Sequence, residues 1–282
     1  MVSWGHLFFI EAAREFLCAF SCAVLFSRIM ASSSLKPESI AMHLSIIIPA
    51  FNEERLIEQC LQSVYASLAT NSQPGFTSEI IVVDNNSTDN TANLARQAGA
   101  RVVFEPVNQI GRARNAGAAE ATGDWLLFVD ADSILNPELL ADILQLIEGG
   151  KYVGCGSAIR MEGLPWWADG VLKLWTVTSV MFRWAAGALV VSRSDAFRDV
   201  GGFDQELYAA DEVTLSQKLK KWGQQRGLQF VILTKHPLES SARKVQLYSG
   251  REIAGQILRV LLRPRRTLQD KKHLSVWYDG RR

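Results

Sequence analysis

The stretch that most constrains the fold is LLFVDADS at residues 126–133. It begins with four apolar residues, which is typical of a strand buried on both faces, and continues directly into Asp130 and Asp132. In an extended chain these carboxylates would lie on the same side and repel one another unless a cation neutralised them. Mg²⁺ and Mn²⁺ are held by one or two carboxylates together with water and substrate phosphate oxygens. We therefore interpret the motif as a divalent-metal site for phosphate chemistry, the alternative being a loop in which Asp132 caps a turn.

Composition excludes some classes of function. The 30 Lys and Arg residues nearly balance the 29 Asp and Glu residues, so no overall positive field favours nucleic acid, and we predict no nucleic-acid partner. The four cysteines lack both zinc-ligand spacing and the density of a disulfide framework, and we expect them to be reduced (Cys18, Cys22, Cys60 and Cys155). This predicts a cytoplasmic protein, including one at the cytoplasmic face of a membrane.

The chain is predicted to have three parts: a leader over 1–43, a domain over 44–245 and a tail over 246–282. The leader contains an apolar run from Phe16 to Phe26, which is shorter than the roughly 20 residues that span a bilayer. A signal peptide is one interpretation, but acidic residues precede the run where positive charge belongs. Translation from Met30 or Met42 is another. We expect the leader to be disordered or dispensable.

From Leu44 onward, strands and helices alternate. The expected strands are 44–51, interrupted by Pro49, then 80–83, 101–104, 125–129, 152–160, 188–192 and 230–233. Helices are expected after most of them; one begins at Asn136 as cap with Pro137 in the first turn. Repeated βα units predict an α/β fold: a single domain with a mainly parallel, doubly wound sheet and helices on both faces. Ligands of such sheets bind outside the carboxyl ends of the strands, where Asp84 and Asp130 fall.

Two segments of the second half have open interpretations. The tryptophan-rich segment is either ordinary core or a surface that stacks on sugar rings or an apolar acceptor (Trp166, Trp167, Trp175 and Trp184). The tail has apolar residues at helical spacing and then three arginines at 263, 265 and 266. It is either a helix packed on the domain or a basic amphipathic helix that makes peripheral membrane contact.

Four motifs in order, LSIIIPAFNEE, IIVVDNNSTDNT, GRARNAG and LLFVDADS, make the chain resemble the family-two glycosyltransferases, which have a GT-A-like fold that binds nucleotide-diphospho-sugars. The likeness covers roughly residues 44–245. It implies that Pro49, Phe51 and Glu53 flank the nucleoside and that Asp84 accepts a hydrogen bond from uracil. Arg114 would lie near the nucleotide with Asn115 beside it, Asp130 would contact the ribose and Asp132 the metal. Gly187 and Ala188 would end the acceptor-side strand.

The chain departs from the family at the catalytic base. The family has Glu-Asp before a Val-x-Leu helix, the Asp being the base, whereas this chain reads Ala-Asp-Glu-Val-Thr-Leu. Asp211 then takes the Glu position and Glu212 the base position, and either could be the base, since geometry decides before pKa. Without the surrounding motifs, both acids could simply interact with the helix dipole.

The resemblance implies a metal-dependent transfer of a sugar from a nucleotide-diphosphate donor, predicted to be UDP-linked, to an acceptor hydroxyl with inversion. Mn²⁺ or Mg²⁺ on Asp132, with Asp130, would stabilise the charge on the departing diphosphate. Arg243, Lys244 and His236 could complete this clamp, although His236 is also interpretable as a loop histidine. The acceptor could be a glycan, a lipid or a small molecule. The alternatives are a nucleotidyltransferase and a non-catalytic nucleotide-sugar-binding scaffold.

Overall fold

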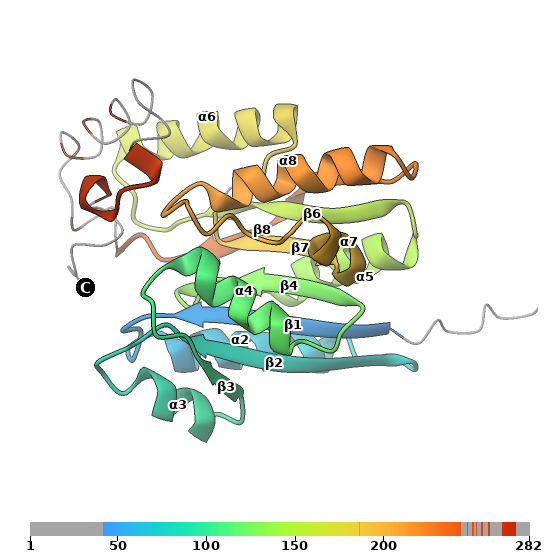
Figure 1. Ribbon diagram of the computed structural model, residues 1–282, viewed down its shortest axis with the longest axis horizontal. Coiled ribbons are helices and arrows are strands. Elements are labelled where there is room, and N and C mark those ends of the chain that lie inside the picture. The colour runs from blue at the N-terminus through green and yellow to red at the C-terminus, as the bar shows by residue number, and fades with distance from the viewer. Residues whose placement is uncertain are drawn as a thin grey trace, which may run out of the picture. The chain divides into compact units, whose positions relative to one another are not determined.

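The computed structural model describes residues 42–185, 187–243 and 267–274, together with residues 247, 250, 252, 255 and 259 (Figure 1). Almost all of the predicted leader, with Cys18 and Cys22, as well as Lys244 and most of the predicted tail, lie outside the described residues. Cys60 and Cys155 are buried free thiols, as expected. No helix in the described ranges combines the length and apolarity needed to cross a bilayer.

The described chain is organised on one eight-stranded sheet with the order β3-β2-β1-β4-β7-β6-β8-β5. The strands are β1 (Met42–Ala50), β2 (Phe76–Asp84), β3 (Arg101–Phe104), β4 (Trp125–Val129), β5 (Ser133–Ile134), β6 (Tyr152–Arg160), β7 (Leu189–Arg193) and β8 (Gln229–Ser240). The β3-β2-β1-β4 half is parallel throughout, and β6 is parallel to β8. By contrast, β7 runs antiparallel to β4 and β6, and β5 runs antiparallel to β8. The α/β class with a mainly parallel sheet is therefore confirmed.

Helices cover both faces of the sheet, because successive side chains of the buried strands point to opposite sides. Ile46 and Ile48 belong to the core cluster that contains α2 (Ile57–Thr70) and α5 (Pro137–Glu148). Ile47 belongs to the cluster that contains α4 (Ile110–Glu120), α7 (Ser194–Asp199) and α8 (Asp211–Gln224). Figure 1 shows α4 in front of the strands and α2 behind them. The helices are α2 (Ile57–Thr70), α3 (Thr91–Gln97), α4 (Ile110–Glu120), α5 (Pro137–Glu148), α6 (Trp166–Phe182), α7 (Ser194–Asp199) and α8 (Asp211–Gln224), with a short 3-10 helix η1 (Lys271–His273).

Local signals in the sequence had mixed outcomes. The predicted cap of α5 is confirmed, since Asn136 Oδ1 accepts a 2.7 Å hydrogen bond from Leu139 N and Pro137 occupies the first turn. The prediction that Pro49 interrupts the first strand is wrong, because β1 continues through it to Ala50. Since β1 pairs with β4 only as far as Ile47, Pro49 has a strand partner on one side alone, which is where a residue without an N–H is tolerated.

Helix α4 approaches the sheet at Gly117, and Gly117→Ala is expected to destabilise the protein by about 1–3 kcal/mol. A Cβ at this position would lie 2.5 Å from Ile47 Cγ2 and 2.8 Å from Val83 Cγ2, so α4 or the strands would have to move. Gly170→Ala on α6 is the matched control, since nothing lies within 4 Å of the added Cβ. We expect it to be neutral or slightly stabilising, as alanine favours helices. Equal melting temperatures for the two variants would contradict the close approach.

Candidate active site

The carboxyl ends of β1, β2 and β4 meet at one edge of the sheet. Ala50 and Asp84 are register partners at the ends of β1 and β2. Asp84 is buried, and its Oδ1 accepts a 2.9 Å hydrogen bond from Ser87 N. Asp130 follows β4, and its N–H donates to Ala188 O at 3.0 Å. The acidic residues predicted for nucleotide binding therefore lie at the edge where α/β sheets bind ligands.

Arg114 joins this edge to the start of α8. Its Nη2 donates to Asp130 Oδ1 at 2.9 Å, and its Nη1 donates to Asp211 Oδ2 at 3.2 Å and to Glu212 Oε1 at 2.9 Å. The guanidinium also lies 5.1 Å from the centre of the Phe203 ring, within the range of a cation–π contact. One buried arginine thus connects three carboxylates from two separate parts of the chain.

These charges perturb one another strongly. Burial disfavours a charged Arg114, but the carboxylates of Glu212, Asp130 and Asp211 outweigh it and raise the pKa of the guanidinium. Burial and the neighbouring Glu212 charge raise the pKa of Asp211 well above its usual value, although Arg114 opposes the shift. Three carboxylates around one guanidinium carry excess negative charge, and a proton on Asp211 relieves it. The cluster is therefore built to hold a proton.

The free energy of unfolding is expected to fall as pH rises towards the pKa of Asp211, and Asp211→Asn should remove this dependence. The folded protein keeps this proton to a higher pH than the unfolded chain, in which the aspartate pKa is about 3.8. The contribution is fully present below that pH and declines by up to about 1.4 kcal/mol per pH unit until the folded-state pKa is passed. Urea unfolding of both proteins across a pH series measures it. If the free energy of unfolding of the wild type, relative to that of Asp211→Asn, instead increased with pH, the raised pKa would be contradicted.

The sequence pattern predicts Asp130 and Asp132 in an extended chain with both carboxylates on the same side. The structure differs, because both residues lie in a turn. A turn follows β4, in which Ser133 N donates to Asp130 O at 3.1 Å, and Asp132 O accepts from Ser241 N at 3.1 Å. Asp130 thereby reaches Arg114, whereas Asp132 lies beside the segment after β8. The cation that neutralises Asp130 in the structure is the Arg114 guanidinium.

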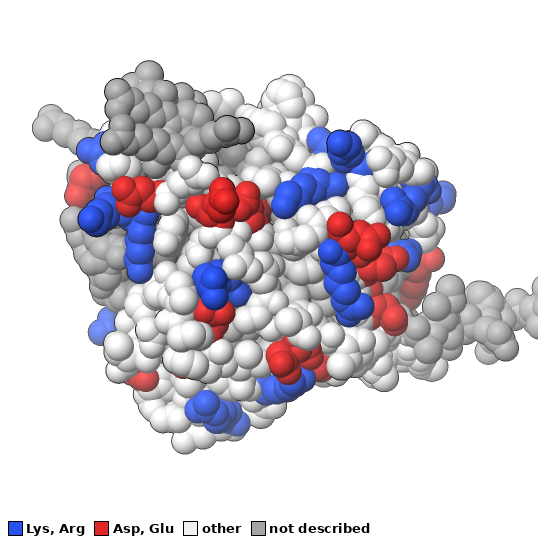
Figure 2. Space-filling view, viewed as in Figure 1, with Lys and Arg blue, Asp and Glu red and all other residues white. Residues whose placement is uncertain are grey.

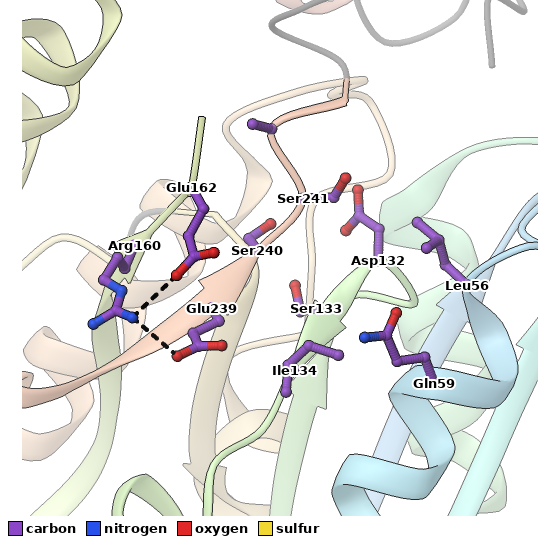
Figure 3. Close-up of a pocket in the computed structure, with 11 residues that line it drawn as sticks. Leu56, Gln59, Asp132, Ser133, Ile134, Arg160, Glu162, Glu239, Ser240 and Ser241 are labelled. Atoms are coloured by element: carbon purple, nitrogen blue, oxygen red, sulfur yellow. Dashed lines mark hydrogen bonds and ion pairs between the residues drawn. The ribbon is translucent and has the colours of Figure 1, made fainter. Parts of the chain in front are cut away.

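Asp132 lines an open pocket of about 240 Å³ (Figure 3). Ser241 and Leu56 lie beside Asp132, and the opposite side is formed by Arg160 with Glu162 and Glu239, to which it is ion-paired at 3.3 Å and 3.5 Å. Besides the Arg160 guanidinium, the polar groups that line this pocket are carboxylates, hydroxyls and the Gln59 amide, whose oxygens suit a hard ion such as Mg²⁺ or Mn²⁺. Across the described residues, however, no three His, Cys, Asp or Glu side chains are grouped to hold a metal. A metal here would depend on Asp132 and on oxygens of the substrate.

His236 does not join Asp130 and Asp132, contrary to the proposed clamp. It lies on β8, and its Nδ1 is 2.9 Å from Asp142 Oδ2 on α5. The sequence placed His236 in a loop after a short strand, but β8 continues to Ser240, so the histidine faces a neighbouring helix.

Arg243 and Glu53 are brought together although 190 residues separate them. Arg243 Nη2 donates to Glu53 Oε2 at 2.7 Å. Glu53 is buried, and its N–H donates to Thr91 Oγ1 at 2.8 Å. Phe51 lies two residues before Glu53, in the bend after β1. This ion pair therefore ties the segment after β8 to the loop predicted to flank the nucleoside.

The predicted end of the acceptor-side strand lies next to Asp130. Gly187 has φ +86°, a conformation that favours glycine, and a Cβ there would lie 2.8 Å from Ile159 Cδ1. Ala188 supplies the carbonyl that accepts from Asp130 N. A larger residue than glycine at 187 would move this backbone relative to Asp130.

Two residues of the α4 region, Gln109 just before the helix and Asn115 within it, have a positioning role that the sequence did not indicate, although Asn115 belongs to the GRARNAG motif. Asn115 Nδ2 donates to Phe203 O at 2.9 Å, and Asn115 Oδ1 accepts from Phe203 N at 3.0 Å. Gln109 Nε2 donates to the carbonyls of Gln205 and Leu207 at 2.6 Å and 2.8 Å. Both side chains hold the loop that precedes Asp211. Their partners are backbone groups about 90 residues away, which no local pattern indicates.

Comparison with known proteins agrees with this arrangement. The family model described as glycosyl transferase family 2 matches residues 45–186, half of the chain. The chain belongs to glycosyl transferase family 2. The matched part of this family member includes the carboxyl ends of β1, β2 and β4 and the Arg114 helix.

The family 2 chain is similar to several known glycosyltransferases. It is 32% identical over 122 residues to an uncharacterized glycosyltransferase of Mycobacterium tuberculosis, covering 43% of this chain and about half, 51%, of that relative. A mannosyltransferase from Pyrobaculum calidifontis, solved with GDP-Man and Mn²⁺, has a TM-score of 0.59 at 20% identity over 91% of this chain and 71% of the other. Glucosyl-3-phosphoglycerate synthase of M. tuberculosis, solved with Mn²⁺, UDP-Glc and phosphoglyceric acid, has a TM-score of 0.53 at 21% identity over 82% and 81%. These structures show that the fold is of the GT-A type.

Proposed function

We propose that this protein is a metal-dependent glycosyltransferase that moves a sugar from a UDP-linked donor to an acceptor hydroxyl with inversion at the anomeric carbon. The observation that carries the proposal is the contact of one buried Arg114 with Asp130 on the donor side and with Asp211 and Glu212 at the start of α8. This contact holds the carboxylates of Asp211 and Glu212 at a fixed position relative to the nucleotide-binding edge. A catalytic base must be held in this way to act on an acceptor that attacks opposite the leaving group.

Glu212 is the better candidate for the base. The side chain of Asp211 is 1% exposed, so an acceptor hydroxyl cannot reach it, whereas the side chain of Glu212 is 12% exposed. Arg114 and Asp211 anchor Glu212 from the buried side. We assign proton removal from the acceptor to Glu212 and its positioning to Asp211.

On the donor side, different residues would contact different parts of the nucleotide-sugar. Asp84 would accept from the base and Asp130 from the ribose, while Asp132 would hold a divalent ion together with diphosphate oxygens. When bound, the ion supplies positive charge that stabilises the departing diphosphate. Because Asp132 contributes one carboxylate, metal affinity should rise when a nucleoside diphosphate is present. A UDP-Glc complex and a GDP-Man complex among the structural neighbours support a nucleotide-sugar donor.

A donor panel tests the proposal. We expect one nucleotide-sugar to be hydrolysed slowly to nucleoside diphosphate in the presence of Mn²⁺ or Mg²⁺, with loss of activity in chelator and at least about tenfold loss in Asp132→Asn. Asp195→Asn on α7 is the matched control, since this carboxylate pairs with Arg193 away from the site, and it should behave as wild type. Donor binding should be measured in parallel, by calorimetry with metal present.

The panel also separates the alternatives. Binding of a nucleotide-sugar without turnover, in the presence of candidate acceptors, would favour a non-catalytic scaffold. Release of pyrophosphate from a nucleoside triphosphate would favour a nucleotidyltransferase. Absence of any nucleotide-sugar binding with metal present would overturn the proposed function. The acceptor class and a site of action at the cytoplasmic face of a membrane are parts of the proposal that need their own tests.

A further inference from the structure

Helix α6 exposes an unusual amount of apolar surface. Of its 17 residues only Ala168 and Ser179 are buried. Its exposed large hydrophobic residues are Trp166, Val171, Leu174, Trp175, Val177, Val180, Met181 and Phe182. Trp166 is 87% exposed, Met181 70% and Leu174 68%. A helix with its apolar residues facing outward is typical of one that lies in a membrane interface or against a partner.

Five of the exposed apolar residues form the outward face of α6 (Trp166, Leu174, Val177, Val180 and Met181). At 100° per residue, Trp166, Leu174 and Met181 project opposite to the buried Ala168 and Ser179. By the same geometry Lys173 lies within this face, and its partner Asp169, at 2.7 Å, lies at the margin. The centre of the outward face therefore carries no acidic residue.

A small cavity of about 10 Å³ lies between α6 and β6, and it is lined by Ser157, Trp175 and Ser179 among others. Ser157 Oγ is buried and has no hydrogen-bond partner within the described part of the chain. Because only Ala168 and Ser179 of α6 are buried, the packing of α6 on the domain does not cover the large apolar residues that it exposes.

Lysine side chains lie beside the C-terminal end of α6. Figure 2 shows Lys and Arg side chains gathered over α8, which carries Lys218, Lys220 and Lys221. Lys220 Nζ donates to Phe182 O at the end of α6 at 2.6 Å. The backbone of Gly250 approaches the Trp167 ring, since a Cβ there would lie 3.4 Å from it. Gly250 belongs to a stretch whose sequence has seven basic residues and one acid, Glu252 (Arg243, Lys244, Arg251, Arg259, Arg263, Arg265 and Arg266).

We propose that the outward face of α6 docks on an anionic lipid bilayer, lying in the plane of the interface. Apolar side chains and nearby basic residues are the two signals that stable peripheral binding requires. Self-association through α6 would bring the α8 lysines of two copies close together, and their repulsion favours an anionic surface over a second copy. The inference does not depend on the proposed function, because binding to vesicles needs neither donor nor acceptor.

Vesicle co-sedimentation of the full chain tests the proposal. We expect binding to vesicles of phosphatidylcholine and phosphatidylglycerol in a three-to-one mixture, weaker binding to phosphatidylcholine alone, and weaker binding at high salt. The combined variant Trp166→Gln, Leu174→Gln and Met181→Gln should lose roughly tenfold or more in affinity. Glutamine keeps helix propensity, and the three side chains are exposed, so the fold should be retained.

The matched control replaces exposed apolar residues elsewhere, Phe104→Gln with Val107→Gln, and should bind as wild type. A second readout is tryptophan fluorescence, whose blue shift on vesicle addition should shrink in Trp166→Phe. Unchanged binding of the α6 variant would overturn the proposal, and so would a loss of binding confined to a variant with residues 263, 265 and 266 changed to glutamine. Absence of vesicle binding would overturn it as well. If light scattering then shows a dimer that the α6 variant dissociates, the face is an interface between copies.

Discussion

Replacing Glu212 with glutamine is expected to lower kcat by about 10²- to 10⁴-fold, the usual contribution of a general base. The glutamine keeps the hydrogen bond to Arg114 through its amide oxygen but cannot accept the acceptor proton. KM for the donor should change little, since the donor residues are untouched. Steady-state rates with the donor identified by the panel measure the effect.

Asp211→Asn is the companion variant. An asparagine resembles the protonated aspartate that the raised pKa indicates, so we expect a much smaller loss of kcat than in Glu212→Gln. If Asp211→Asn proves the more damaging of the two, the buried residue is the base, and the assignment made from exposure is wrong.

Arg114→Met is expected to destabilise the protein by about 3–5 kcal/mol, the cost of removing one partner from a buried ion pair. Methionine fills part of the space but leaves Asp130, Asp211 and Glu212 facing one another without a cation. The loss should be larger at high pH than at low pH, where protonation relieves the repulsion. Urea unfolding monitored by circular dichroism gives the free energy of unfolding.

Arg112→Met is the control for this variant, since it removes an arginine from the same helix. The side chain of Arg112 is 36% exposed and pairs at 3.3 Å with the buried Glu105, so the pair is half exposed and we expect a smaller loss than for the fully buried Arg114. Similar losses in the two variants would mean that the Arg114 contacts add nothing beyond a half-exposed ion pair.

Local sequence patterns predicted the parts of the fold that depend on local physics. Buried strands such as β4 are continuous apolar runs, and the α5 cap is set by neighbouring residues. The pattern did not predict α6, because a helix that is apolar on its exposed side lacks the polar face by which amphipathic helices are found. It also could not show that β7 lies between β4 and β6, since that pairing joins residues far apart in the chain.

The candidate site divides in the same way. Motifs indicated Asp84, Arg114 and Asp130, but the sequence could not show that Arg114 also contacts Asp211 and Glu212, 97 and 98 residues away. The turn after Asp130, which sends Asp132 to a different neighbour, depends on its pairing with the segment after β8. These arrangements follow from how the sheet is assembled, which no single stretch specifies.

The hydrogen bonds from the α4 region to the loop before α8 have a consequence for how such proteins can vary in sequence. Gln109, Arg114 and Asn115 fasten residues 203–212 to the donor half, while the chain from the end of β6 to the start of β7, including α6, lies outside these contacts. Within that segment α6 can vary without changing where Glu212 lies relative to the donor edge, provided that Gly187 and Ala188 keep their place beside Asp130. The frame is modular: one fixed catalytic geometry can be combined with many surfaces that choose where, and on what, it acts.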